Sequence, residues 1–213
     1  MKRAALILAL GLSLGSGTFA QTFEDYFVDK TLRLDYIFMG NADKQDICLD
    51  ELSVLPQWAG RRHHLSELPL EGNGEITMKD KATGKVIYRT SFSSLFQEWI
   101  GEQEAKVVKR GFENTFLVPY PKQPAEITVV LRNASREVSA TLVHEVNPSD
   151  ILIHQRGEGD LTPHRYLWQG GSSDKCIDVA IMAEGYAANE SDLFTKMRRW
   201  RVKPCLHMNR LRS

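Results

Sequence analysis

The chain has 213 residues, of which 42% are hydrophobic, and its 27 basic and 27 acidic residues leave no net charge. The balance conceals an asymmetry, because residues 195–213 hold seven Lys or Arg and no acid, while residues 21–194 hold 18 basic and 27 acidic residues. A body with a net charge of −9 is unsuited to nucleic acid, so we expect no such partner. Three cysteines do not make a disulfide framework.

Residues 1–20 have the three-part pattern of a secretory signal peptide. Lys2 and Arg3 precede an apolar run over residues 4–14, and small residues follow up to Ala20, after which we expect cleavage. The run is too short to cross a bilayer, which needs about 20 residues. We therefore expect an exported protein without a membrane span, in the periplasm, at the cell surface or outside the cell.

The next part of the chain has a hydrophobic period of two, which indicates β-strands. The clearest strand ends at Gly40 and places four apolar side chains on one face, those of Leu32, Leu34, Tyr36 and Phe38. A second strand covers residues 47–55. A third, over residues 112–118, is expected to end before Pro119, and a helical turn is expected over residues 94–99.

Two β-hairpins are predicted from paired strands with turn residues between them. The first joins residues 75–79 to residues 86–92, with Gly84 in the turn, where a positive φ is easy for glycine. The second joins residues 127–131 to residues 138–146. Many short strands of this kind predict an all-β fold, a two-sheet antiparallel sandwich.

The sandwich is expected over residues 21–156, with eight predicted core residues: Leu32, Leu34, Tyr36, Ile76, Met78, Tyr88, Val129 and Leu131. Residues 157–174 are rich in Gly and Ser and predict a linker. Residues 175–194 then resemble the opening of an α/β domain. The apolar run from Cys176 to Ala183 predicts a strand buried on both faces, and Asn189 is typical of a helix N-cap.

The basic tail, residues 195–213, does not continue the helix that should follow Phe194. One permitted choice of codons for residues 196–211 translates in another reading frame into an acidic, amphipathic segment that joins naturally to Phe194. We therefore expect a frameshifted or disordered terminus. The alternative is a genuine basic tail that binds an acidic partner or anionic lipid.

No catalytic, cofactor-binding or metal-ligating residue is assigned. His144 and Glu145 begin an apparent HExxH zinc motif, but Pro148 stands where the second histidine is needed. His63 and His64 are adjacent, and neighbouring side chains of an extended chain point to opposite faces, so a shared metal is not expected. Glu158 and Asp160 lack the ligand density of a calcium loop.

Four aromatic residues could form a carbohydrate platform, but their separation in the sequence favours core packing: Trp58, Trp99, Tyr120 and Trp168. Cys48 and Cys176 lie in apolar contexts that favour buried thiols. A single bridge between them is the alternative in an oxidising compartment.

Two segments resemble a known family. Residues 31–41 are similar to the first strand of the N-terminal domain of the IgA-peptidase family of zinc metallopeptidases, metallopeptidase family 64. Residues 178–194, with Glu184-Gly185-Tyr186 inside, resemble the start of that family's catalytic domain. The resemblance covers about residues 22–194.

The resemblance implies a β-sandwich that precedes a zinc peptidase domain carrying HExxH. This sequence contains no such motif, so no zinc ligand or general base is carried over, and zinc is expected only in the full-length family. The expected function is a non-catalytic accessory domain of a secreted metallopeptidase, cut short before its active site. The alternative is a stand-alone secreted binding module for a glycan or glycoprotein. In either case a host or bacterial glycoprotein is the expected partner, and the chain is expected to be a monomer.

Deletion of residues 173–213 is predicted to leave the melting temperature of the sandwich unchanged and to improve solubility. The seven basic residues of the tail have no acidic partner within it, and an isolated apolar strand exposes unpaired backbone groups. Thermal unfolding of the full and shortened chains checks this. A fall of several degrees in the shortened chain would make the tail a genuine structural element.

Overall fold

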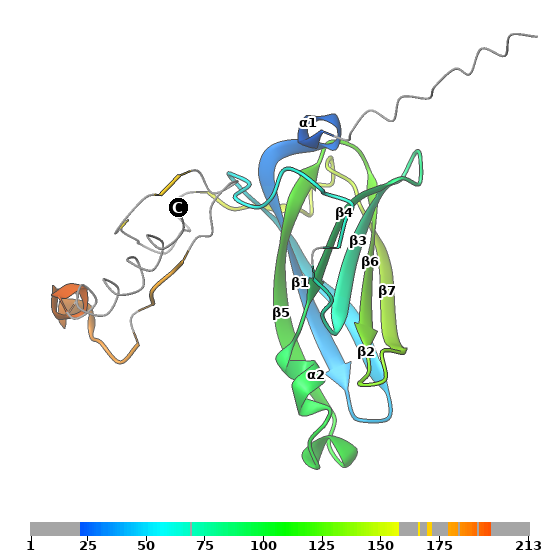
Figure 1. Ribbon diagram of the computed structural model, residues 1–213, viewed down its shortest axis with the longest axis vertical. Helices are drawn as coiled ribbons and strands as arrows, with labels where there is room; N and C mark the ends of the chain where they lie inside the picture. The colour runs from blue at the N-terminus through cyan, green and yellow to red at the C-terminus, as the bar shows by residue number, and fades with distance from the viewer. Residues whose placement is uncertain are drawn as a thin grey trace, which may run out of the picture. The chain divides into compact units, whose positions relative to one another are not determined.

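The computed structural model describes residues 22–68, 70–157, 166, 170–171, 179–182, 184–190 and 192–196. The chain divides into two compact units, Met1–Lys175 and Cys176–Ser213. In the first unit, two four-stranded sheets pack against each other, with short helices at their ends (Figure 1). The predicted all-β sandwich is confirmed.

The first sheet has the strand order β5-β1-β2-β8. Its centre is β1 (Phe27–Gly40), which pairs antiparallel with β2 (Gln45–Leu55) on one side and with β5 (Arg110–Pro121) on the other. The two-residue β8 (His154–Gln155) adds a parallel edge to β2. The sheet thus joins the first strands of the domain to its last one.

The second sheet has the strand order β4-β3-β6-β7 and is antiparallel throughout. It contains the two predicted hairpins, β3 (Gly74–Asp80) with β4 (Val86–Phe92) and β6 (Ala125–Arg132) with β7 (Val138–Val146). Both hairpins are confirmed, and Gly84 has the positive φ of 68° that the first turn requires.

Short helices lie at opposite ends of the sandwich (Figure 1). α1 (Phe23–Tyr26) leads into β1, while α2 (Leu95–Trp99) and η1 (Glu104–Lys106) precede β5. α2 begins where the Ser94 hydroxyl accepts a bond from the Gln97 amide, as an N-cap does. An aromatic cluster links α2 to both sheets through ring centroids 4.3–6.3 Å apart, in Phe38, Phe92, Phe96, Trp99, Phe112 and Phe116.

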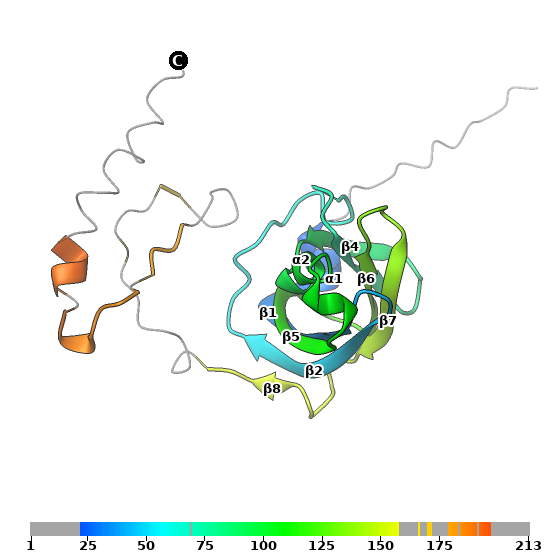
Figure 2. The ribbon, with the colours of Figure 1, turned by 90° about the horizontal axis from the view of Figure 1, so that it is seen from below.

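The core lies between the two sheets, because each strand turns every second side chain inward. The inward residues of β1 and β6 are all buried, and so are all eight core residues predicted from the sequence. In a view along the strands the sheets curve around a shared interior, with β2 and β7 side by side at one seam (Figure 2).

Two sequence predictions about β2 and β5 are wrong in detail. Cys48 is exposed rather than buried, because Ile47 is the residue that turns inward and Cys48 lies opposite Ile37 on the outer face of the first sheet. β5 continues through Pro119 and Pro121 instead of ending before them. It is an edge strand, where a proline without an N–H is tolerated.

The second unit is described in part. Gly185 makes a turn at φ 76°, η3 (Ala188–Glu190) follows, and residues 192–196 are helical. The rings of Tyr186 and Phe194 lie 5.3 Å apart. The helix therefore includes Thr195 and Lys196, which the sequence analysis assigned to the tail without fixed structure.

The buried strand predicted between Cys176 and Ala183 is described only at residues 179–182, which pair with no described strand. Val179 and Met182 are exposed there, so these residues do not have the burial that we predicted. Residues 1–20, for which we predicted a signal peptide, lie outside the described residues, as do Cys176, Trp168 and residues 197–213.

Leu34→Ala is predicted to lower the free energy of unfolding by about 2–5 kcal/mol, because the Leu34 side chain is fully buried at the centre of the first sheet. Ile151→Ala is the matched control, since Ile151 is 94% exposed and its change should stay within about 0.5 kcal/mol. Urea unfolding of the three proteins gives both values. Equal stabilities would refute the role of Leu34 in the core.

Candidate functional site

The outer face of the second sheet carries charged side chains that point away from the core. Along β3, Glu75 and Thr77 face outward between the buried residues Gly74, Ile76 and Met78. On β4, Ser91 lies opposite Glu75 and Arg89 opposite Thr77. This alternation is the ordinary consequence of a strand with one buried face.

Glu75 is held in a tight ion pair on this face. Its Oε1 accepts bonds from Arg89 at 2.6 and 3.0 Å and from the Thr77 hydroxyl at 2.9 Å. Burial by itself would raise the pKa of Glu75, but the bonds from Arg89 and Thr77 and the positive charges of Arg89 and Arg132 hold this pKa below its ordinary value. Glu75 is therefore a fixed negative charge at neutral pH.

The loop between β2 and β3 is fastened over β4 by Arg61. The Arg61 guanidinium donates to the carbonyls of His64, Leu65 and Glu67 at 2.5–3.2 Å, and to that of Arg89 on β4. The Arg89 amide in turn donates to the Leu65 carbonyl at 2.9 Å. A guanidinium has five N–H donors in a rigid plane, so it can bond to several carbonyls at once. The single ammonium group of a lysine could not do this.

The end of the same loop meets the β6–β7 turn through Arg136. Its guanidinium donates to the Gly72 carbonyl at 3.2 Å and lies 3.4 Å from a Glu71 carboxylate oxygen. Arg132 donates to the Arg136 carbonyl at 3.3 Å. Glycine at position 72 lets the loop lie close against β4, because a Cβ there would lie 2.1 Å from the Phe92 carbonyl oxygen.

These contacts enclose a cavity of about 310 Å³ on the outer face of the second sheet, which we call the arginine-lined cavity. Its lining consists of Leu68, Glu71, Gly72, Gly74, Glu75, Arg89, Ser91, Arg132 and Arg136. Three arginines and two glutamates give it one excess positive charge. Ser91 is the one hydroxyl among these described residues, and no histidine stands beside it to act as a base, so the lining suits binding rather than nucleophilic catalysis.

A second polar group joins the end of the domain to β2. Glu51 Oε1 lies 3.0 Å from His154 Nδ1 and accepts a bond from Arg156 at 3.1 Å, while Arg156 also donates to the Ser53 hydroxyl at 3.0 Å. The Arg156 amide donates to the Val54 carbonyl. The arrangement holds β8 in place and explains its parallel pairing with β2.

His144 is used structurally. Its Nε2 lies 2.7 Å from the Tyr36 hydroxyl inside the sandwich, whereas Glu145 faces outward and pairs with Lys81. Because the two side chains point to opposite faces, they cannot share a metal. Burial lowers the pKa of His144 and raises that of Tyr36, so the pair is neutral at neutral pH.

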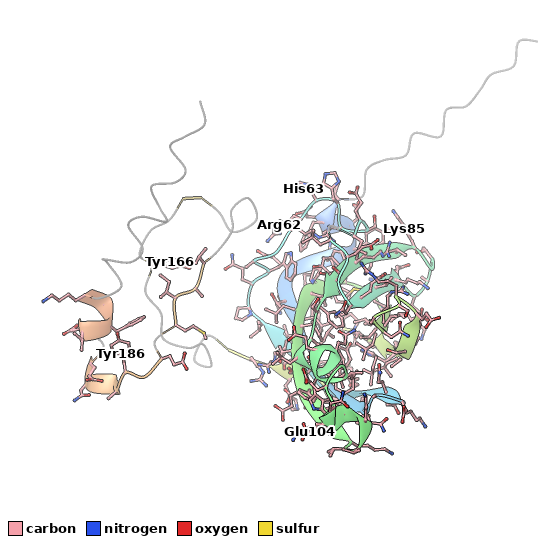
Figure 3. All side chains as sticks on the ribbon, turned by 60° about the horizontal axis from the view of Figure 1, so that its bottom comes forward. Arg62, His63, Lys85, Glu104, Tyr166 and Tyr186 are labelled. Carbon is pink, nitrogen blue, oxygen red and sulfur yellow. The ribbon has the colours of Figure 1, made fainter. Side chains whose placement is uncertain are left out.

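The other residues weighed in the sequence lie apart. His63 and His64 are exposed on the loop at the end opposite Glu104 (Figure 3), and His64 bonds Glu67 at 2.8 Å. Trp58 and Tyr120 are buried, with polar atoms bonded to the Arg61 and Pro148 carbonyls. Trp99 packs in the aromatic cluster, so the three described aromatics form no common platform. Glu158, Asp160 and Trp168 lie outside the described residues.

Within the described part of the chain, no three His, Cys, Asp or Glu side chains gather as metal ligands do. These residues therefore do not fit the zinc that the resemblance implies for the full-length family. No helix in the same part of the chain is long and apolar enough to cross a membrane.

The fold defines a β-sandwich domain, and a sequence comparison supplies its family. The family described as "Peptidase M64 N-terminus" matches residues 22–143. This is more than half of the chain, which therefore belongs to the family as an N-terminal domain of M64 peptidases. The resemblance seen in the sequence is confirmed to that extent. No curated protein matches the chain.

The family match ends within β7, but the sandwich continues beyond it. Val146 at the end of β7 is fully buried, and β8 is tied to β2 by Arg156. The strands of the sandwich therefore extend beyond the family match to β8.

The sequence analysis missed the arginine-lined cavity. The outward positions of Glu75, Arg89 and Ser91 follow from the predicted hairpin. The sequence does not predict that Arg136 and the loop near Gly72 also line the cavity. They reach it through contacts between segments that are far apart in the chain.

Unfolding free energy is predicted to fall between about pH 7 and pH 5.5 because of His144. Its pKa is lowered in the folded state, so the unfolded chain takes up the proton first as the pH falls below the usual histidine value of about 6.5. His144→Gln should flatten this part of the profile, and His63→Gln, on the exposed loop, should leave it unchanged. Denaturant unfolding at several pH values measures the slopes. An unchanged slope in H144Q would contradict the assignment.

Proposed function

We propose that this chain is the non-catalytic accessory domain of an exported zinc metallopeptidase of the IgA-peptidase type. The observation that carries the proposal is the family match over residues 22–143, which covers a sandwich rather than an active site. The signal-peptide pattern of residues 1–20 supports export to the periplasm, the cell surface or the medium. The absence of HExxH from the sequence supports a role other than hydrolysis.

The accessory role would be to hold a substrate glycoprotein. A domain that binds one part of a substrate raises the effective concentration of another part at a linked active site, without taking part in the reaction. The arginine-lined cavity supports such a role, since its convergent polar groups are typical of a binding site.

A stand-alone binding module for a glycan or glycoprotein is the second candidate, and the same cavity favours it. The two candidates differ in whether the chain improves the action of a peptidase domain. Joining residues 21–157 to an active family peptidase domain, with the peptidase domain alone as the control, separates them. The accessory role predicts a lower KM on a glycoprotein and an unchanged kcat.

The purified chain is predicted to hold no stoichiometric zinc and to cleave no protein, because the described residues offer no cluster of metal ligands. Metal analysis by mass spectrometry and a proteolysis assay with and without a chelator check this. One tightly held zinc per chain, together with chelator-sensitive cleavage, would overturn the non-catalytic role. Sequencing the N-terminus of exported material, expected to begin at Gln21, tests the export.

A further inference from the structure

The arginine-lined cavity has a positive charge that its own carboxylates do not neutralise. Arg89 is paired with Glu75 and Arg136 with Glu71. Among the described residues, Arg132 lies within 4 Å of no carboxylate. Its guanidinium is half-buried on the outer face of β6 and donates one bond, to the Arg136 carbonyl. An anion that enters the cavity would therefore meet Arg132.

The geometry of the lining favours a carboxylate. Guanidinium groups bind planar carboxylates through parallel N–H bonds, and an arginine on a strand is held more firmly than one on a free loop. Arg132 is on β6, and Arg136 is fixed by its bonds to the Gly72 carbonyl and to Glu71. These two of the three guanidinium groups that line the cavity are thus positioned before a ligand arrives.

The remaining polar groups suit hydroxyls. The carboxylates of Glu71 and Glu75 accept hydrogen bonds, and the Ser91 hydroxyl, which donates to the Leu70 carbonyl, can accept one as well. Glu75 is only 16% exposed and already ionised, so it stays available as an acceptor without a change of protonation. A ligand with one carboxylate and several hydroxyls would satisfy both halves of the lining.

Other anions fit less well. One excess positive charge balances a monoanion, whereas the two glutamates would repel a phosphate dianion. The carboxylate of an acidic peptide could reach Arg132, but a peptide brings few hydroxyls for Glu71 and Glu75. At about 310 Å³ the cavity is at the small end of ligand sites, which favours a single ring over an extended chain.

We propose that the arginine-lined cavity binds an acidic monosaccharide unit of a glycan, with its carboxylate on Arg132 and Arg136 and its hydroxyls on Glu71, Glu75 and Ser91. This assignment rests on the proposed recognition role and names its ligand class. It places the binding site on the outer face of the second sheet, away from the aromatic residues that the sequence analysis weighed as a sugar platform.

Calorimetric titration of the purified full chain with glucuronic acid and with N-acetylneuraminic acid tests the proposal. At least one acid should bind saturably and about tenfold or more tightly than glucose and N-acetylglucosamine. Inorganic phosphate and the peptide Gly-Glu-Gly are the competing anions. Equal binding of neutral and acidic sugars, a preference for phosphate or the peptide, or no saturable binding of either acid would overturn the assignment.

Three variants locate the site. Arg132→Gln should weaken acid binding about tenfold or more, and Arg110→Gln should not, because Arg110 is paired with Glu104 at the α2 end of the sandwich. Glu71→Gln keeps a side-chain oxygen that can accept a hydroxyl, but it removes a negative charge that repels the ligand's carboxylate. It should therefore strengthen binding, and it tests the site even if R132Q fails to fold. Unchanged affinity in a folded R132Q, or weaker binding in E71Q, would place the ligand elsewhere.

The result is separable from the zinc measurement. A chain without zinc that ignores both acids would refute the ligand assignment and leave the accessory role in place. A chain that binds the acids and also holds catalytic zinc would support the ligand assignment and refute the non-catalytic accessory role.

Discussion

The structure depends on the burial of one face of β1. This strand is the centre of the first sheet, and its inward side chains from Leu32 to Phe38 are almost completely removed from water. β2 and β5 pair with it on either side, and the inward residues of β3 and β6 cover it from the second sheet. Because the register of β1 decides which side chains face the core, a slip by one residue would expose the apolar row and turn the paired Arg33 and Asp35 toward the core. The outer faces of both sheets, including the arginine-lined cavity, are free for polar groups because this inner contact is satisfied.

Arginine side chains organise the surface of the sandwich. Arg61 fastens the loop between β2 and β3 through backbone carbonyls, Arg136 joins that loop to the β6–β7 turn, and Arg156 ties the last strand to β2. The bonds of Arg61 to the Arg89 carbonyl, of Arg136 to the Gly72 carbonyl and of Arg156 to Glu51 join segments that are distant in the sequence. The same property explains the cavity, since a guanidinium that is held by backbone carbonyls retains its charge and remaining donors for a ligand. A rigid frame of this kind lowers the entropic cost of binding, because the site is arranged before the ligand arrives.

Family membership and structure give complementary information about function. The match to the N-terminal domain of M64 peptidases identifies the family but names no ligand and no reacting residue. The polar groups of the described sandwich are used mainly for internal contacts. Examples are the bond between Tyr36 and His144 and the contact between Glu51 and His154. The arginine-lined cavity differs from them in having an excess positive charge and an open hollow of about 310 Å³. Recognition is therefore the activity that we propose for this domain.

The sequence by itself determined the sandwich, its hairpins and the inward residues of β1, β3 and β6, because alternation and turn residues are local properties. It also excluded an HExxH zinc motif at His144 and Glu145, since Pro148 stands where the second histidine is needed. Tertiary structure alone decided the exposure of Cys48, the passage of β5 through Pro119 and the assembly of the cavity. The physical reason is the same in each case. Contacts between distant parts of the chain decide whether a strand lies at the edge of a sheet and which loop covers its outer face. The local alternation of apolar residues carries no information about such contacts.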